Sequence, residues 1–214
     1  MVRAMRKTPA AEARPYHHGD LRRALVDAAR RLLESDGPTA LSLRAVAREA
    51  GVSPAAPYHH FKDKAELLDA VAQQGWVLLE QQMLDAKAAA EGRGQLTALG
   101  IAYVCFARDN PALYRVMYDA ARDKEALPLE LREGDPDNPY CLVRNTLIEN
   151  GADPALAADL ELATIAAWCG AHGLAEMAGF KQFDPLKAEL GGERPFLAAV
   201  LSHMGLFPAL RPHG

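Results

Sequence analysis

One stretch of 28 residues constrains the fold of this chain more than any other: LSLRAVAREAGVSPAAPYHHFKDKAELL, residues 41–68. Ser42 stands where its side chain can cap a short helix with apolar residues at helical spacing, and Gly51 ends that helix. Ser53 can then cap a second short helix, with Pro54 at its first position, where a missing N–H costs nothing. The stretch therefore predicts two short helices joined by a tight glycine turn.

Two helices in this arrangement are typical of a helix-turn-helix motif that binds DNA. The second helix, about eight residues or ~12 Å long, fits a major groove roughly 12 Å wide, while the first helix braces it across the backbone. Ala55 and Ala56 are small enough to let the backbone approach base edges, and their methyl groups can meet thymine methyls. Tyr58, His59 and His60 supply hydroxyl and ring N–H donors suited to phosphate oxygens. We expect these five residues, together with Ser53 at the start of the helix, to face DNA.

Basic side chains extend this surface in both directions along the chain. Lys62 and Lys64 lie at the start of the next helix, where the helix dipole also favours an anion. Arg44, near the start of the first helix of the motif, is long enough to reach a guanine edge or a phosphate. The net charge of the chain is −4, yet residues 1–64 hold 12 of the 24 Lys and Arg and only 7 of the 28 Asp and Glu. This asymmetry indicates a nucleic-acid-facing N-terminal unit joined to an acidic body.

Helical periodicity continues along the rest of the chain. Half of the residues are hydrophobic, and most of them are Ala and Leu, which have high intrinsic helix propensity. We therefore predict an all-α fold, with an N-terminal three-helix DNA-binding domain that contains the helix-turn-helix, followed by a larger helical domain. The expected helices outside the motif are 21–36, one from Asp63 to the Gly92 break, 96–109, 111–118, 142–150, 154–177 and one from Pro195 onward, with a polar loop at 119–139. The expected domains are a flexible basic arm at 1–16, the DNA-binding domain at 17–64 and the larger helical domain at 65–214.

The helix at 154–177 is apolar on nearly all sides and needs cover on every face, so we expect a second subunit to supply part of that cover. No run of about 18 apolar residues appears, and the N-terminus lacks the apolar stretch of a signal peptide, so a soluble cytoplasmic protein without a membrane partner is expected. The odd number of cysteines, without C-x-x-C spacing, indicates reduced thiols. These cysteines are Cys105, Cys141 and Cys169.

Residues 21–68 resemble the DNA-binding domain of TetR-family repressors. Small, aromatic and basic positions agree with the family pattern in register, from Ala28-Ala29 through Leu41-Ser42, Val46-Ala47, Ala50-Gly51-Val52-Ser53, Tyr58, His60-Phe61 and Lys64 to Leu67-Leu68. The resemblance implies phosphate contacts by Ser42, Tyr58, His60 and Lys64, and positions at base edges for Arg44, Ala55 and Ala56.

Pro57 departs from the family pattern, which most often has a large apolar residue such as Leu at this position. With Ser53 as the cap, Pro57 is the fourth helical residue and removes the first hydrogen bond of the helix, from residue i to i−4. We therefore expect a loosened opening turn in the recognition helix, with an altered docking angle and altered base contacts.

The C-terminal part carries Trp168-Cys169-Gly170-Ala171-His172-Gly173, which resembles the W-x-x-x-H-G signature of one subgroup of TetR-family regulatory domains. The segment AYVCFARDNPALYRVMY, residues 102–118, has a similar character. The resemblance implies a homodimer through the last two long helices and a repressor of a pseudo-palindromic operator. It also implies that residues 65–214 are a regulatory, ligand-binding and dimerisation domain, with a small-molecule effector inside the helical body whose binding weakens DNA affinity.

Several large side chains in this second domain are candidates for the lining of an effector pocket. Taken singly, each of them fits an ordinary core position better than a pocket lining, and no sequence rule says which side chain faces a cavity. The candidates are Trp76, Met83, Tyr103, Phe106, Tyr114, Met117, Trp168 and His172.

Two metal hypotheses are weaker than the interpretations above. Cys169, His172 and Glu176 share a helix face, but a hydrogen-bonded core histidine fits that helix better than a metal ligand. The tetrapeptide PYHH occurs at 15–18 and again at 57–60, yet adjacent histidines on a helix point about 100° apart, which disfavours a zinc site. We expect no metal, and we expect the first PYHH to be an accessory DNA contact at the end of the basic arm.

Enzyme chemistry has no support in the residue pattern. Glu-x-x-His pairs of di-iron bundles, Gly-rich phosphate loops and nucleophile elbows are all missing, so we expect neither an enzyme nor a cofactor. Two alternatives to the repressor remain: a helical ligand-binding or interaction module without DNA binding, motivated by Pro57, and a metal-responsive sensor at Cys169 and His172.

Overall fold

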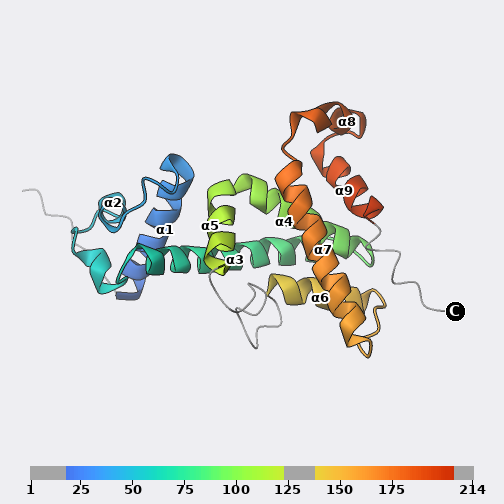
Figure 1. Cartoon of the computed structure of the whole chain (residues 1–214), viewed down its shortest axis with the longest axis horizontal. Helices are drawn as coiled ribbons and strands as arrows, with labels where there is room; N and C mark the ends of the chain where they lie inside the picture. The colour runs from blue at the N-terminus through green and yellow to red at the C-terminus, as the bar shows by residue number, and fades with distance from the viewer. Residues whose placement is uncertain (1–17, 123–137, 205–214) are drawn as a thin grey trace, which may run out of the picture.

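The fold is built around one long helix that runs through most of the molecule (Figure 1). The computed structural model describes residues 18–122 and 138–204, and each regular element in these two ranges is an α-helix or a 3-10 helix, which confirms the all-α prediction. The elements are α1 (His18–Asp36), α2 (Leu43–Glu49), η1 (Ala56–His59), α3 (Lys64–Ala88), α4 (Gly94–Asp109), α5 (Pro111–Arg122), α6 (Pro139–Glu149), α7 (Ala157–Met177), η3 (Lys181–Phe183), α8 (Asp184–Glu189) and α9 (Glu193–His203).

Local hydrogen bonds explain where the helices of the N-terminal part begin and end. The side chain of Ser42 accepts a hydrogen bond from the N–H of Ala45 (3.1 Å), which caps α2 as predicted. The side chain of Asp63 accepts one from the N–H of Glu66 (2.9 Å), which caps α3. Gly51, in the turn between α2 and η1, has φ +69°, a left-handed conformation that glycine adopts without steric cost. The predicted helix, glycine turn and capped long helix are therefore present.

The second helix of the motif differs from the prediction. Instead of an α-helix from Ser53 through Phe61, the structure has a four-residue 3-10 helix, η1, and the side chain of Ser53 does not cap it. The N–H groups of Tyr58 and His60 each donate to the carbonyl three residues earlier, at 3.2 and 2.9 Å. The physical reason is Pro57, which has no N–H to donate to residue i−4 and so favours the tighter bonding pattern.

A single hydrophobic core runs from the N-terminal helices to α9. It begins with Leu25 and neighbouring residues of α1, continues along both flanks of α3, and reaches Leu201 in α9. Helices α4 and α5 pack against α3, α7 packs across α4 and α6, and α9 covers α4 near the end of the described chain (Figure 1). Because α3 contacts α1 as well as α4 and α5, it joins the N-terminal helices to the helical body.

Several predicted boundaries differ from those observed. Helix α5 continues to Arg122 instead of ending at Tyr118, and α6 begins at Pro139 instead of Leu142. Helix α7 begins at Ala157 instead of Pro154, and the segment 181–189 contains η3 and α8, which the residue pattern did not predict. The predicted arm at 1–16, the first PYHH up to His17, and the predicted loop between 123 and 137 lie outside the described residues.

None of the helices within residues 18–122 and 138–204 is both long enough and apolar enough to span a membrane.

Candidate nucleic-acid interface and interior cavity

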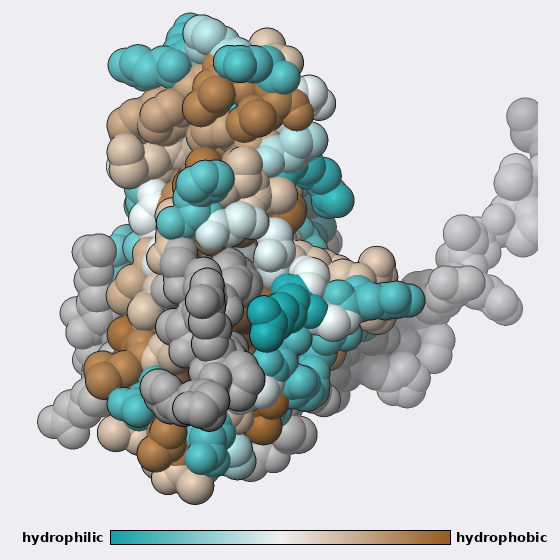
Figure 2. All heavy atoms as spheres, turned by 90° about the vertical axis from the view of Figure 1, so that its right-hand side faces the viewer, coloured by the Kyte–Doolittle hydropathy of each residue, from teal (hydrophilic) through white to brown (hydrophobic). Residues whose placement is uncertain are grey.

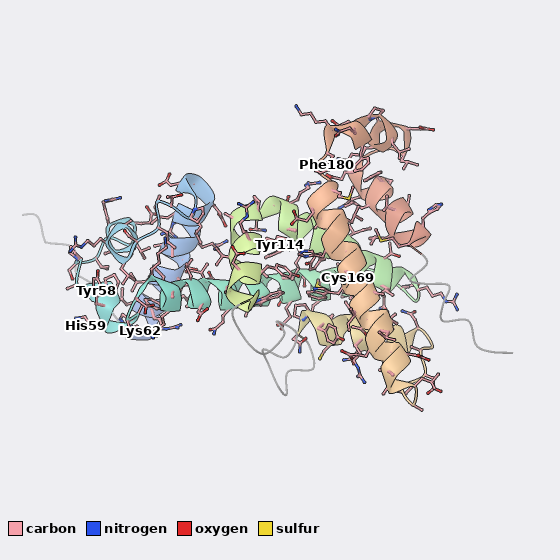
Figure 3. All side chains as sticks on the ribbon, viewed as in Figure 1. Tyr58, His59, Lys62, Tyr114, Cys169 and Phe180 are labelled. Carbon is pink, nitrogen blue, oxygen red and sulfur yellow. The ribbon has the colours of Figure 1, made fainter. Side chains whose placement is uncertain are left out.

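The residues predicted to contact DNA lie together at one end of the molecule, on α2, η1 and the start of α3. Figure 3 shows Tyr58, His59 and Lys62 side by side at this end. Eight of the ten predicted residues have exposed side chains. The exposed eight are Ser42, Arg44, Ser53, Ala55, Tyr58, His59, Lys62 and Lys64, and the half-buried two are Ala56 and His60.

Opposite sides of η1 have different environments. Pro57 is buried, so its ring occupies an interior position, where a large apolar residue is usual in the family that this motif resembles. Tyr58, the next residue, is 53% exposed. Phe61 is buried beneath the guanidinium of Arg22, whose central carbon lies 5.1 Å from the ring centroid. The buried rings of Pro57 and Phe61 therefore anchor η1 to the core, while the side chain of Tyr58 remains exposed to solvent.

Two predicted phosphate contacts already have a partner inside the chain. Ser42 accepts the capping hydrogen bond described above, and the ammonium of Lys64 donates to the carbonyl of Pro38 at 3.0 Å. The serine hydroxyl still has its own proton to donate, and the ammonium has three donors in total. Both side chains therefore combine a structural contact with capacity for a phosphate oxygen.

This double role of Ser42 leads to a prediction. Ser42→Ala removes the cap and is expected to lower the free energy of unfolding by about 1 kcal/mol, and to weaken DNA binding. Ser42→Asp keeps a good cap, because a carboxylate also accepts the N–H and suits a helix N-terminus, but it repels a phosphate. Urea denaturation and gel-shift titration should thus separate the two roles, with Ser42→Asp stable yet the weaker DNA binder. Wild-type affinity in Ser42→Asp would exclude a phosphate contact at this residue.

Polar contacts fix α2 against the rest of the N-terminal part. The guanidinium of Arg31 in α1 pairs with the carboxylate of Glu49 in α2 at 2.9 Å. The side-chain amide of Gln74 in α3 donates to the carboxylate of Asp27 in α1 at 2.6 Å. These contacts hold α1 and α2 in one orientation relative to α3.

A second group of polar side chains meets inside the helical body, between α4, α5 and α7. The hydroxyl of Tyr103 is hydrogen-bonded to Tyr114 (2.9 Å), to Tyr118 and to Nδ1 of His172 (3.1 Å). Tyr114 is also 2.5 Å from the same Nδ1, and the indole N–H of Trp168 donates to Tyr118 at 3.1 Å. We call these five residues the tyrosine cluster. Each hydroxyl can donate one proton and accept another within the cluster, so the cluster is satisfied internally.

Burial keeps the tyrosines of this cluster protonated. Burial raises the pKa of Tyr103 far above its usual value, and the nearby hydroxyls of Tyr118 and Tyr114 raise it further. Burial likewise raises the pKa of Tyr118, and it raises the pKa of Tyr114 to about 12. Burial and the carboxylate of Glu161 also raise the pKa of Tyr140, whose hydroxyl donates to that carboxylate. These hydroxyls are therefore neutral donors and acceptors at ordinary pH.

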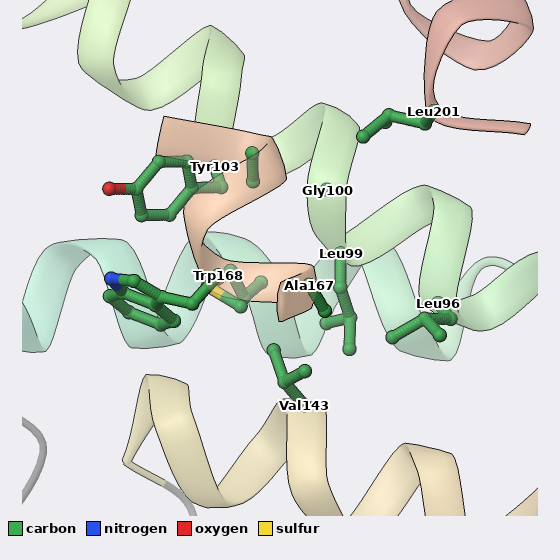
Figure 4. A pocket seen from close by; sticks show the side chains of 10 residues that line it. Leu96, Leu99, Gly100, Tyr103, Val143, Ala167, Trp168 and Leu201 are labelled. Carbon is green, nitrogen blue, oxygen red and sulfur yellow. The ribbon is translucent and has the colours of Figure 1, made fainter. Parts of the chain in front are cut away.

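A small cavity lies next to the tyrosine cluster (Figure 4). Its volume is about 20 Å³. Of the predicted pocket residues, Met83, Tyr103 and Trp168 line it. The other lining residues are Leu96, Leu99, Gly100, Val143, Ala167, Ala171 and Leu201.

The remaining pocket candidates have other surroundings. Tyr114 and His172 belong to the tyrosine cluster, and the ring of Trp76 lies 5.5 Å from that of Tyr118 and 6.3 Å from that of Trp168. Phe106 and Met117 are buried in the core and do not line the cavity. Tyr118 was missed, although its position four residues after Tyr114 places the two on one helix face.

The three residues of the metal hypothesis do not converge. Cys169 is exposed on α7, whereas Nδ1 of His172 faces the hydroxyls of Tyr103 and Tyr114. Within residues 18–122 and 138–204, no group of three His, Cys, Asp or Glu side chains could hold a metal ion.

An apolar stripe lies on the outer face of α7, where Figure 3 labels Cys169. Leu162 is 65% exposed, and Ile165 and Met177 are also exposed at helical spacing from it. Small side chains at Ala166, Cys169 and Gly173 continue the same exposed face. Figure 2 shows that hydrophobic side chains also gather at the top of the molecule, where α8 and α9 lie. We call the α7 face the α7 stripe.

Comparison with known proteins gives two family matches. Residues 25–71 match the family described as bacterial regulatory proteins, tetR family, and residues 96–200 match the tetracyclin repressor-like C-terminal domain. Together the two matched segments cover well over half of the chain.

The alignments with curated relatives cover only part of each relative's length. An HTH-type transcriptional regulator of Bacillus subtilis (strain 168), YobS, is 31% identical over 133 residues, which are 62% of this chain and 66% of the relative. The HTH-type transcriptional regulator BetI of Rhizobium meliloti (strain 1021) is 42% identical over 79 residues, 36% of this chain and 39% of the relative. The chain thus matches less than two thirds of the length of these curated relatives.

Similar solved structures extend over nearly the whole chain. A protein of unknown function from Rhodococcus sp. RHA1 is 33% identical, with a TM-score of 0.72 over 94% of this chain and 100% of that one. The TetR family transcriptional regulator PfmR of Thermus thermophilus is 19% identical, with a TM-score of 0.56 over 88% of this chain and 99% of that one. At that identity the second likeness concerns the fold alone.

Proposed function

This chain belongs to the TetR family of bacterial regulatory proteins, and from that premise we propose that it is a cytoplasmic, homodimeric repressor that binds a pseudo-palindromic operator. The observation that carries the proposal is the two-sided α2–η1 unit. Leu43, Val46 and Pro57 of this unit are buried, whereas Arg44, Tyr58 and the neighbouring donors are exposed at one end of the molecule. A surface of donors supported by a rigid interior suits contact with a phosphate backbone and base edges.

The α7 stripe supports the proposed dimer. Exposed apolar side chains on one helix face lose contact with water when a second copy covers them, and small residues allow two helices to approach closely. The family resemblance implied an interface through the last two long helices, and in our proposal α7 supplies most of that interface with α9 beside it. In a two-fold dimer the operator half-sites then lie about 34–36 Å apart, or a multiple of that distance.

An effector regulates DNA binding in the proposed mechanism. The effector binds inside the helical body and favours a conformation in which the two η1 elements no longer match successive major grooves. Residues Trp168 to Gly173 suit the W-x-x-x-H-G subgroup, because Trp168 and His172 both belong to the tyrosine cluster. We propose this subgroup as the finer assignment.

The alternative without DNA binding was motivated by Pro57. The burial of Pro57 weakens that motive, because the proline occupies an apolar position and leaves Tyr58 and His59 exposed. Gel-shift titration against the DNA upstream of the gene, together with a selected random pool, decides between the two. We expect a saturable complex whose affinity falls steeply with salt. If neither DNA gives a saturable complex, the alternative is favoured.

Lys64 offers a quantitative test of the proposed phosphate contacts. Lys64→Ala is expected to weaken binding to all DNA sequences and to lower the salt slope by about one, because one phosphate contact is lost. The matched control is Lys181→Ala, which removes the same charge from an exposed lysine in η3. A salt slope that stays the same in Lys64→Ala would show that Lys64 serves only the carbonyl of Pro38.

A further inference from the structure

We propose that the effector is a small, uncharged molecule made mainly of hydrocarbon, and that it binds in the cavity between α4, α6 and α7 by pushing Leu201 of α9 aside. The inference names the chemical class of the effector and the wall that moves, so it rests on the function proposed above. It follows from the chemistry of the cavity wall, from the size of the cavity and from one close contact.

The cavity wall has no polar group available for a ligand. Tyr103 and Trp168 are the only lining residues with a polar side-chain atom, and both atoms are engaged in the tyrosine cluster. Figure 4 shows the hydroxyl of Tyr103 and the indole nitrogen of Trp168 pointing away from Leu96, Leu99 and Val143. A charged or strongly polar ligand would therefore lose its hydration without compensation, whereas a hydrocarbon has no polar group that needs a hydrogen-bond partner.

The cavity is too small for such a ligand as it stands. Its volume of about 20 Å³ compares with about 150 Å³ for an apolar cavity that holds benzene. Binding therefore requires one wall to move. The wall formed by Tyr103 and Trp168 is held by hydrogen bonds across three helices, and Leu99 and Met83 are buried in the middle of the core.

The wall formed by Leu201 is the one that can move, because it belongs neither to the tyrosine cluster nor to the middle of the core. Leu201 reaches the cavity from α9, which lies at the edge of the molecule and covers α4 (Figures 1 and 4). A Cβ added to Gly100 of α4 would lie 2.9 Å from Cδ1 of Leu201, so this leucine occupies space that exists only because residue 100 is glycine. Moving Leu201 outward enlarges the cavity without displacing α4 or the tyrosine cluster.

Small side chains on α7 define where the ligand lies. Ala167 and Ala171 line the cavity one turn apart, and a larger residue at either position would fill the space. The two tryptophans of the chain, Trp76 and Trp168, report on the same region, because their ring centroids are 6.3 Å apart and Trp168 lines the cavity. A heavy-atom quencher in the cavity would therefore reduce the intrinsic fluorescence.

The test is a titration of the full chain with bromobenzene, followed by tryptophan fluorescence, with 4-bromobenzoate as the charged counterpart. We expect saturable quenching by bromobenzene and none by 4-bromobenzoate. Leu201→Ala creates the space in advance and is expected to tighten bromobenzene binding by roughly tenfold or more. Ala171→Leu is expected to abolish saturable quenching. Leu197→Ala is the matched control, since it truncates a buried leucine of the same helix that does not line the cavity, and it should bind as wild type does.

Other outcomes overturn the inference. Absence of saturable quenching in wild type and in Leu201→Ala excludes a hydrocarbon site, and equal quenching by 4-bromobenzoate excludes the uncharged class. Tighter binding in Leu197→Ala, or unchanged binding in Ala171→Leu, places the ligand elsewhere. The titration contains no DNA and the gel shift contains no ligand, so the two tests are independent. If bromobenzene does not bind but the protein binds its operator, only the proposed effector class is excluded. If bromobenzene binds but no DNA complex forms, only the proposed function is excluded.

Discussion

Replacing Leu162 with lysine is expected to convert the protein into a folded monomer and to remove most of its operator affinity. Leu162 is 65% exposed in the single chain, so the substitution leaves the core intact. In the proposed dimer the same position is covered, and two lysine ammonium groups would lose water without gaining a partner. A monomer holds one half-site only, and loss of the linked second half-site costs roughly 10²–10⁴ in avidity.

Analytical ultracentrifugation and gel-shift titration on the same samples check this expectation. The control is Val77→Lys, which places the same charge on another exposed apolar position, in α3, outside the α7 stripe. The control should remain a dimer and should bind the operator. If Leu162→Lys sediments as a dimer, the interface lies elsewhere, whereas a monomer with full operator affinity contradicts the two-half-site mechanism.

The helices that sequence reasoning predicted best are those with a complete local signal. Ser42 and Asp63 cap α2 and α3 through hydrogen bonds to residues three positions later, and Gly51 adopts its turn conformation for a steric reason of its own. These interactions depend on near neighbours in the chain, so a short stretch contains all the information needed.

The 3-10 geometry of η1 was harder to predict because two local signals compete. Ser53 and Pro54 favour an α-helical start, whereas Pro57 removes the hydrogen bond that would continue it. Sequence reasoning identified the proline as a disturbance, yet the burial of its ring depends on packing against the rest of the N-terminal part. That packing is a tertiary effect that spacing alone does not encode.

The interior site also depends on tertiary packing that residue spacing does not predict. Aromatic residues at helical spacing identified Tyr103, Tyr114, Trp168 and His172 as interior candidates, and all four meet in the tyrosine cluster. The cavity itself depends on small residues such as Gly100 and Ala171, which mark a void only when the surrounding helices are known. Glycine and alanine at these positions therefore give no sequence signal that predicts a cavity.

Helix α5 connects the interior site to the N-terminal helices. Its residues Tyr114 and Tyr118 belong to the tyrosine cluster, while Met117 lies against α3 at Gly75, where an added Cβ would come within 2.5 Å of the Met117 sulfur. The same helix packs against α1. A change at the tyrosine cluster therefore acts on a helix that already touches both halves of the chain.

Above about pH 10 the free energy of unfolding is expected to fall steeply, because the cluster tyrosines hold their protons only in the folded state. Burial raises the pKa of Tyr103 and Tyr118 far above that of an unfolded tyrosine, and it raises the pKa of Tyr114 to about 12. The unfolded chain releases these protons first as pH rises. The stabilisation is thus complete below about pH 10 and is lost above it, for Tyr114 up to about pH 12.

Tyr103 and Tyr118 each contribute a fall of up to about 1.4 kcal/mol per pH unit in this range, or up to about 3 kcal/mol together. The measurement is urea denaturation from neutral to alkaline pH in a Tyr16→Phe/Tyr58→Phe background, in which every remaining tyrosine is one with a raised pKa. We expect tyrosinate absorbance to appear only together with loss of helix, and Tyr103→Phe to flatten the pH dependence. Tyrosinate that forms near pH 10 in the folded protein would contradict a buried, proton-holding cluster, because hydroxyls that ionise freely are not shielded from water.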